Sequence, residues 1–451
     1  MSTAFLPAQA AAQLRDATSV VGTAVSRIDL YAPPGSWSEL PWDSLPTTRR
    51  PPGAVLLGLR VHADLAVNAV RIPTCGGRGT IRLDGQPVRS EPRAPVVLTL
   101  SPGPHRVTWE VRVSTYERRV ACGEPPTVGH AMAAIDGVRL LDFPSPHRAG
   151  GLAVVVLPPG HDQKKPATVL LGTHPWNGDP WTYAAYTELL DEAASQQLVL
   201  LMPSGLGNSL YTADAEDEVF LALNALSAAI AVDPRAVSIW GASMGGAGAT
   251  TLGFHRPDRF ATITSYFGDS KYDVTTYVRS LLASDPTAHT LNALDIVDNA
   301  RHVPVWLIHG DDDHVSPLVQ STMLYDALRE RGFNVRFDRV AGAGHEGALV
   351  ARFLREVIRR AAKARVPHPV TRVSYTSVRP DLVDAYGVHL LRLSNRGDAT
   401  VDLERRPDGI HVRRASGLRG LVLTPGWLGA TPGTPVTMDD GSSLEVTWAR
   451  P

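Results

Sequence analysis

The pentapeptide at residues 241–245, Gly-Ala-Ser-Met-Gly, constrains this chain more than any other feature. It directly follows the apolar run Ala236–Trp240. The pattern G-x-S-x-G between a strand and a helix is typical of a nucleophile elbow. The corner strains the backbone at the serine, and the flanking glycines remove side chains that would clash there. The sequence therefore predicts that Ser243 is a nucleophile presented at the end of a strand.

The chain also carries a base and an acid at suitable places. A serine hydroxyl is a weak nucleophile at neutral pH, so it needs a base, and the base needs an orienting acid. After an elbow of this kind the acid comes next along the chain and the histidine last. Asp313 follows the apolar run Val305–Ile308, and His345 follows the strand-like run Val335–Val340. We therefore predict a catalytic triad of Ser243, Asp313 and His345.

Four neighbours of these residues compete for the same roles. Asp311 and Asp312 are alternative acids, which we interpret as solvated loop charges or turn-forming residues. His309 and His314 are alternative bases. Both lie beside the acid and not after a later strand, so the order of the elements favours His345 over them.

Acyl transfer also needs two backbone N–H groups that bind the oxyanion. The N–H of Met244 is predicted as the first, because it opens the helix after the elbow, where the helix dipole favours an anion. The second is expected in the loop after the strand-like run Ala167–Leu171. Pro175 in this loop lacks an N–H, so we assign the role to Trp176. We also expect Trp176 and His174 to contact substrate, with His174 in addition supporting the loop.

The stretch from about Val155 to Lys363 resembles the α/β-hydrolases, and within them the polyhydroxyalkanoate-depolymerase-like and prolyl-oligopeptidase-like branch. The resemblance implies a mostly parallel, doubly wound sheet, the same triad, and chemistry without a cofactor. Relatives often carry glycine where this chain has Pro175. The matching segments are Gly241–Gly248, Pro257–Phe260, Pro304–Gly310 and Gly342–His345.

Turn signals divide the chain into three predicted domains. Residues 1–135 read as a β-sandwich with a hairpin at Asp84-Gly85, and they loosely resemble galactose-binding-like jelly rolls, which suggests a carbohydrate ligand as a hypothesis. Residues 136–365 form the predicted α/β-hydrolase catalytic domain. Residues 366–451, after Pro367, are predicted to form a small C-terminal β-sandwich.

Composition limits the partners and the compartment. A net charge of −1 over 451 residues argues against nucleic acid or an anionic membrane as the main partner. Met1–Arg15 lacks the pattern of a signal peptide, so we expect a cytoplasmic protein as written, or a secreted or periplasmic one if the N-terminus is processed. Cys75 and Cys122 form either a disulfide or two free thiols. Metal-binding patterns such as CxxC and HExxH are absent from the sequence, so no metal is predicted.

The leading functional prediction is a serine hydrolase that cleaves carboxylic esters through an acyl-enzyme. Its substrate would be a small-molecule or polymeric ester. The same machinery also suits a serine peptidase or amidase. A protein of a different class, a binding scaffold with an inactive hydrolase core, is the third alternative.

Overall fold

The structure is a computed structural model. It describes residues 81–88, 141–147, 152–274 and 288–449, apart from gaps at 163, 177, 179, 181 and 184–185, and otherwise only strands between residues 28 and 142. The chain splits into two compact units. The first comprises Met1–Asp233 with Leu354–Ala362, and the second Pro234–Phe353 with Lys363–Pro451. The predicted division into three domains stays a prediction.

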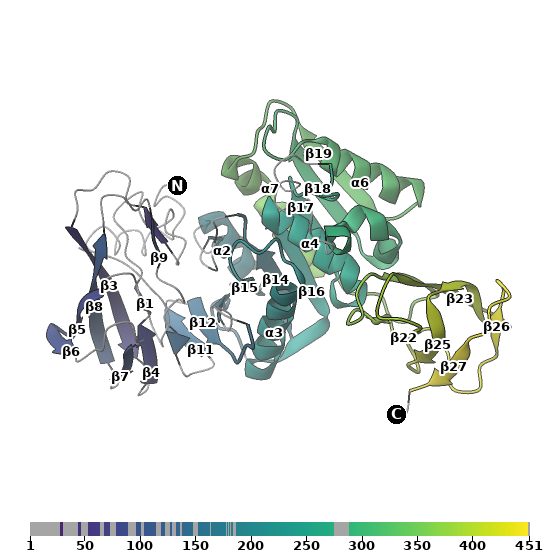
Figure 1. The fold of residues 1–451 in the computed structure, drawn as a ribbon, viewed down its shortest axis with the longest axis horizontal. Coiled ribbons are helices and arrows are strands. Elements are labelled where there is room, and N and C mark those ends of the chain that lie inside the picture. The colour runs from purple at the N-terminus through teal and green to yellow at the C-terminus, as the bar shows by residue number, and fades with distance from the viewer. Residues whose placement is uncertain are drawn as a thin grey trace. The chain divides into compact units, whose positions relative to one another are not determined.

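The beginning of the first unit is built of antiparallel strands (Figure 1). One sheet has the order β1-β3-β8-β5-β6, a second has the order β10-β4-β7, and β2 pairs with β9. The bounds are Ile28–Asp29 (β1), Ser44–Pro46 (β2), Gly53–Ala63 (β3), Val67–Ile72 (β4), Arg78–Leu83 (β5), Gln86–Val88 (β6), Val96–Leu100 (β7), Gly103–Val113 (β8), Arg119–Ala121 (β9) and Thr127–Val128 (β10).

The hairpin expected at Asp84-Gly85 is confirmed. These two residues connect β5 to β6, with Leu83 opposite Gln86. Their φ angles are 51° and 82°, the left-handed values that a two-residue turn of this kind requires. Cys75 and Cys122 lie outside the described residues, and so do most side chains on which a carbohydrate site would depend.

The rest of the first unit mixes strands and helices. Its strands follow the order β11-β12-β13-β15-β14, and only β14 and β15 run parallel to each other. Every residue of β15 is buried, as its unbroken apolar run implies. The bounds are Met132–Ile135 (β11), Val138–Asp142 (β12), Leu152–Val156 (β13), Ala167–Thr173 (β14), Thr187–Ser195 (α2), Leu198–Pro203 (β15) and Ala213–Ala229 (α3).

The second unit begins with four neighbouring parallel strands, β16 to β19. Because they are parallel, the loops that follow them meet at one edge of the sheet, where ligands bind in open α/β sheets. The elements along this stretch of the chain are Val232–Ala242 (β16), Met244–His255 (α4), Pro257–Arg259 (η2), Ile263–Tyr266 (β17), Ala288–Leu291 (η3), Ala293–His302 (η4), Val305–Gly310 (β18), Val319–Glu330 (α6), Val335–Val340 (β19) and Gly347–Lys363 (α7), of which Leu354–Ala362 belongs to the first unit.

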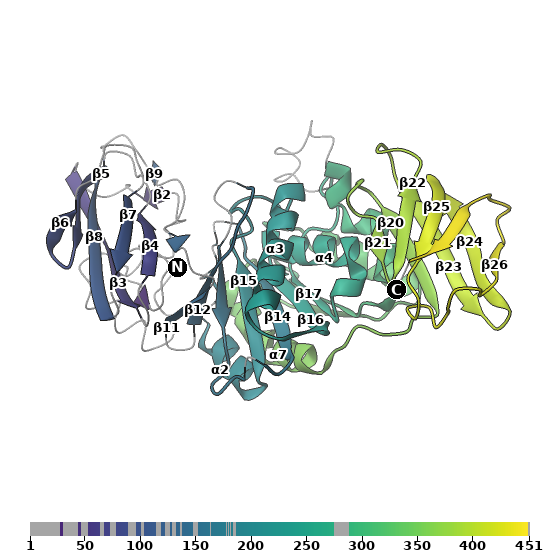
Figure 2. The same ribbon diagram turned by 90° about the horizontal axis from the view of Figure 1, so that it is seen from below.

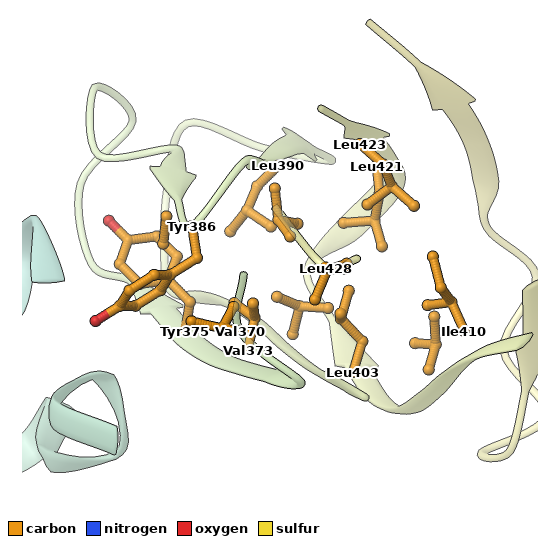
Figure 3. Packing of buried hydrophobic residues seen from close by; sticks show 14 of the residues in the cluster. Val370, Val373, Tyr375, Tyr386, Leu390, Leu403, Ile410, Leu421, Leu423 and Leu428 are labelled. Carbon is orange, nitrogen blue, oxygen red and sulfur yellow. The ribbon is translucent and has the colours of Figure 1, made fainter. Parts of the chain in front are cut away.

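The C-terminal module of the second unit consists of two four-stranded sheets (Figure 2). Their orders are β20-β23-β24-β26 and β21-β22-β25-β27. Apolar side chains from both sheets fill a common core (Figure 3). The bounds are Arg372–Ser377 (β20), Asp384–Ala385 (β21), Val388–Arg392 (β22), Ala399–Arg406 (β23), Gly409–Ser416 (β24), Leu418–Leu423 (β25), Val436–Met438 (β26) and Glu445–Trp448 (β27).

Two tyrosines join this module to the end of helix α4. In Figure 3 the hydroxyls of Tyr375 and Tyr386 point away from the leucine-rich core. The Tyr375 hydroxyl donates to the carbonyl oxygen of His255 at 2.7 Å, and that of Tyr386 donates to the carbonyl oxygen of Pro257 at 3.0 Å. The side-chain amide of Asn299, in a helix before the module, adds a bridge: it donates to the carbonyl oxygen of Phe254 at 2.9 Å and to that of Thr376 at 3.0 Å. The module is therefore bonded directly to the segment that follows the predicted nucleophile.

The architecture confirms the predicted fold class, an α/β-hydrolase core flanked by β modules. No helix among the described residues is long and apolar enough to cross a membrane. Within the same part of the chain, no group of three or more His, Cys, Asp or Glu residues is placed to hold a metal ion.

Candidate active site

Ser243 occupies the strained corner between β16 and α4. Its φ is 57° and its ψ is −123°, a combination that non-glycine residues rarely adopt. The Ser243 N–H donates to the carbonyl oxygen of Tyr266 at 2.9 Å, which fixes the corner against β17. A Cβ at Gly246 would approach that same carbonyl oxygen to 2.6 Å, so the tight turn requires a glycine there. Strain of this size costs about 1–3 kcal/mol and typically accompanies function.

The structure brings Ser243, His345 and Asp313 together in one hydrogen-bonded chain. The Nε2 atom of His345 lies 2.8 Å from Ser243 Oγ, and its Nδ1 atom lies 2.8 Å from Asp313 Oδ2. An ionised carboxylate only accepts hydrogen bonds, so Nδ1 carries the proton and Nε2 is free to accept that of the serine. The three residues lie in the loops after β16, β18 and β19, and their geometry is that of a nucleophile, a base and an orienting acid.

The surroundings of Asp313 keep its carboxylate ionised. Its Oδ1 atom accepts the N–H groups of Val315 at 2.8 Å and Ser316 at 2.9 Å. Burial alone would raise the pKa of Asp313, but hydrogen bonds from the imidazoles of His309 and His345 outweigh burial and hold this pKa well below its usual range. The carboxylate is therefore charged at any pH at which His345 could act as a base.

Phe267 lies against the imidazole of His345, a contact that the sequence did not indicate. The two ring centroids are 4.4 Å apart, with the planes inclined at 51°. Phe267 has a φ of 38°, an uncommon left-handed value for an aromatic residue, and its N–H donates to the carbonyl oxygen of Ile308 at 2.8 Å. The strained backbone after β17 thus places an apolar wall beside the base.

Asp311 ties the acid loop to the histidine loop, so its interpretation as a merely solvated charge needs correction. Its Oδ1 atom accepts the N–H of Gly342 at 2.7 Å. The Asp312 N–H donates to the carbonyl oxygen of Ala343 at 3.0 Å. A Cβ at Gly310 would lie 2.0 Å from that carbonyl oxygen, so only glycine permits this approach. The two loops are therefore held together just before His345.

The remaining alternatives occupy different environments. The side chains of Asp312 and His314 are 66% and 87% exposed and pair with each other at 3.2 Å, as expected of solvated loop charges. His309 is fully buried next to Asp313. Neither His309 nor His314 takes the place of His345 beside Ser243, whose hydroxyl bonds to His345.

His174 is placed as a scaffold of its loop. Its side chain is buried, with Nδ1 2.9 Å from the carbonyl oxygen of Pro175 and Nε2 2.8 Å from that of Ser204. Both ring nitrogens thus lie next to backbone oxygens, as expected of a residue that supports its loop, and the expected substrate contact of His174 stays a prediction. Met244 opens α4, and Trp176 is partly buried. Their roles as oxyanion donors, and that of Trp176 in the substrate pocket, stay predictions.

A further carboxyl group, Asp269, was missed by the sequence analysis. It follows β17, and its Oδ1 atom accepts the hydroxyl of Ser316 at 2.6 Å. Burial raises the pKa of Asp269, against the opposing effect of the Ser316 hydrogen bond. The only signal in the sequence was its position, one loop away from the acid at the same edge of the sheet.

The comparisons with known proteins place these residues in context. A model of the prolyl oligopeptidase family matches residues 207–363, a stretch that contains Ser243, Asp313 and His345. A segment of 49 residues is 39% identical to acyl-protein thioesterase 1 of Neurospora crassa. That segment is 11% of this chain and 20% of that protein, so the match covers only a fifth of the relative.

Two solved structures illustrate the fold. S-formylglutathione hydrolase from Agrobacterium tumefaciens is 16% identical, with a TM-score of 0.46, and the match covers 52% of this chain and 98% of that one. Acylaminoacyl peptidase from Pyrococcus horikoshii is 18% identical, with a TM-score of 0.41, covering 52% and 40% respectively. The match to the prolyl oligopeptidase family, over the stretch that contains Ser243, Asp313 and His345, supports a serine hydrolase.

Proposed function

We propose that this protein hydrolyses carboxylic esters through an acyl-enzyme on Ser243. One observation carries the proposal: the unbroken hydrogen-bonded chain from Ser243 Oγ through both nitrogens of His345 to the buried carboxylate of Asp313. A hydroxyl aligned with a neutral imidazole, itself oriented by an ionised acid, is the arrangement that makes serine nucleophilic.

The proposed reaction proceeds in two halves. Ser243 Oγ attacks the acyl carbon while His345 Nε2 takes the hydroxyl proton, and a tetrahedral intermediate forms. Its oxyanion is bound by the N–H group of Met244, at the start of the helix after the elbow. His345 then returns the proton to the leaving alcohol, and the acyl group remains on Ser243. Water attacks this ester in the second half, with His345 again taking and returning a proton, and the carboxylic acid leaves.

Asp313 contributes electrostatically and does not move a proton. Its charge stabilises the imidazolium that exists during each half, and its hydrogen bond keeps the Nδ1 tautomer of His345. Phe267 restricts the imidazole from one side. We propose small-molecule or polymeric esters as the substrates, since this geometry supports acyl transfer without favouring one alcohol.

A second candidate, cleavage of a peptide or amide bond by the same residues, is favoured by the match of residues 207–363 to the prolyl oligopeptidase family. The chemical steps are the same, but the leaving group is an amine, which requires a proton from His345 more strongly than an alkoxide does. Only the leaving group separates the two proposals, so the experiment must vary it.

The test is a comparison of kcat/KM for p-nitrophenyl esters of increasing acyl length with that for aminoacyl p-nitroanilides, using wild type and Ser243→Ala. We expect the esters to be the better substrates and the alanine variant to lose activity by a factor of about 10⁴ or more. Anilides exceeding esters would favour the peptidase. An alanine variant with a tenth of the wild-type turnover would exclude Ser243 as the nucleophile.

A further inference from the structure

The carboxylate of Asp313 contacts two imidazoles. His345 is one, at 2.8 Å from Oδ2, and His309 is the other, with its Nε2 atom 3.4 Å from the same oxygen. Both the Asp313 side chain and that of His309 are completely buried. The mechanism above uses His345 and leaves His309 without a role.

The hydrogen bonds of His309 fix which of its nitrogens carries the proton. Its Nε2 atom lies 2.9 Å from the carbonyl oxygen of Ser316, which can only accept. Nε2 must therefore be protonated, and Nδ1, 2.8 Å from Ser321 Oγ, accepts the serine hydroxyl. The Nε2 proton then faces the Ser316 carbonyl and Asp313 Oδ2 together. His309 consequently presents a permanent donor to the acid.

Ser316 connects this donor to the rest of the acid loop. Its N–H donates to Asp313 Oδ1 at 2.9 Å, its carbonyl oxygen accepts from His309, and its hydroxyl donates to Asp269 Oδ1 at 2.6 Å. All the backbone and side-chain polar groups of one residue are thus used around the acid. A buried network in which each group is satisfied is rigid and depends on all its members.

We propose that His309 is a positioning residue of the active site, which orients the Asp313 carboxylate toward His345. It comes from β18, directly ahead of the acid loop, so the strand sets its place before the loop begins. It touches neither Ser243 nor solvent, and it acts only through Asp313. The inference rests on the proposed function, because it assigns His309 to the acid of that mechanism.

The test replaces the donor and then restores it. His309→Leu removes the N–H, whereas His309→Gln keeps an amide N–H near the position of Nε2. The first measurement is the rate constant for inactivation by a fluorophosphonate dye. In this reaction Ser243 Oγ attacks phosphorus, fluoride leaves and His345 takes the proton of the hydroxyl. This reaction requires the triad but no particular ester. The second reading is kcat and KM for p-nitrophenyl acetate, per folded enzyme. His314→Leu, the same change at the exposed histidine nearby, is the matched control.

For His309→Leu we expect kcat and the inactivation rate to fall by a factor of about 10–100 with KM unchanged, since small misplacements of catalytic groups cost that much. The glutamine variant should recover to within a few-fold of wild type, and His314→Leu should match wild type. A leucine variant that is inactivated at the wild-type rate, or glutamine as poor as leucine, would overturn the inference while leaving the triad intact.

Two further outcomes have a clear meaning: a His309→Leu variant that does not fold, and a wild type that is labelled but hydrolyses no ester. If His309→Leu does not fold, Ser321→Ala replaces it, because loss of the hydroxyl releases Nδ1 and lets the ring turn. A smaller fall in the inactivation rate then supports the inference, and an unchanged rate refutes it. Wild type that is labelled on Ser243 but hydrolyses no ester would contradict the proposed function, and the role of His309 would still be measured by labelling.

Discussion

Removing the hydroxyl of Tyr375 should destabilise the protein without affecting catalysis. This hydroxyl donates to the carbonyl oxygen of His255, the last residue of α4, at 2.7 Å and approaches that of Leu382 at 3.2 Å. Tyr375 is 1% exposed, so water cannot replace the lost donor. A buried hydrogen bond contributes about 0.5–1.5 kcal/mol to stability, and we expect Tyr375→Phe to lower the free energy of unfolding by that amount.

Distance separates this effect from the chemistry. The twelve residues of α4 span about 18 Å at 1.5 Å per residue, and Ser243 precedes the other end of the helix. The kcat for p-nitrophenyl acetate should therefore stay within about twofold, because a factor of two corresponds to only about 0.4 kcal/mol of barrier.

The assay is urea unfolding at 25 °C followed by circular dichroism, with kcat measured on the native variant. Tyr325→Phe is the matched control, since within the described part of the chain the hydroxyl of Tyr325 makes no hydrogen bond while its ring packs 5.4 Å from Phe337. Unchanged stability in Tyr375→Phe would refute the argument about the buried hydroxyl. A large loss of kcat would show that the C-terminal module acts on the site itself.

Three further predictions concern the acid loop and the module. Asp313→Asn should lower kcat by a factor of about 10⁴ in steady-state assays, and Asp312→Asn should leave kcat unchanged. The kcat of Asp311→Asn should lie between these two, because the variant weakens the hydrogen bond from the Gly342 N–H that holds the loops together. Equal losses of kcat in Asp312→Asn and Asp313→Asn would reassign the acid. Folding raises the pKa of Asp269, so the folded protein binds more protons than the unfolded one, and its stability should fall as the pH rises from about 3.9 through the raised pKa. Between pH 4 and 7 the urea midpoint should therefore fall less steeply for Asp269→Asn than for wild type. Identical slopes in the two proteins would contradict this. A chain ending at Arg365 loses the hydroxyls that Tyr375 and Tyr386 donate to the end of α4, so it should unfold at lower urea, with its folded fraction still cleaving small esters; a folded but inactive chain would place part of the site in the module.

The sequence predicted the features of the site that depend on local pattern. Gly241-Ala242-Ser243-Met244-Gly245 indicated the corner because a strand run, a small-residue turn and a helix are contiguous along the chain. The order of the acid and the histidine along the chain followed from the order of the strands. In the structure His345 is hydrogen-bonded both to Asp313 and to Ser243.

The features that were missed depend on contacts between loops. Asp269 and Phe267 follow β17, and only the packing of that loop against those after β18 and β19 places them at Ser316 and His345. Nothing in the adjacent sequence encodes such a contact. Asp311 was misread for the same reason, since its partner, Gly342, lies in a different loop.

His174 shows the opposite difficulty. A histidine in a loop after a strand suggests chemistry, but burial of both ring nitrogens against the carbonyl oxygens of Pro175 and Ser204 gives it a structural role. Residue type and position predict which groups are available, whereas only packing determines whether a substrate could reach them.

The proposed mechanism requires that Ser243 carries the acyl group during turnover. The most direct measurement is mass spectrometry of the peptide that contains residues 241–245, taken from enzyme quenched with acid milliseconds after mixing with p-nitrophenyl acetate. We expect a mass increase of one acetyl group on Ser243, which is absent in Ser243→Ala and accumulates with the burst of p-nitrophenol. An acetyl group on any other residue during the burst, or steady turnover by Ser243→Ala, would contradict the proposed mechanism.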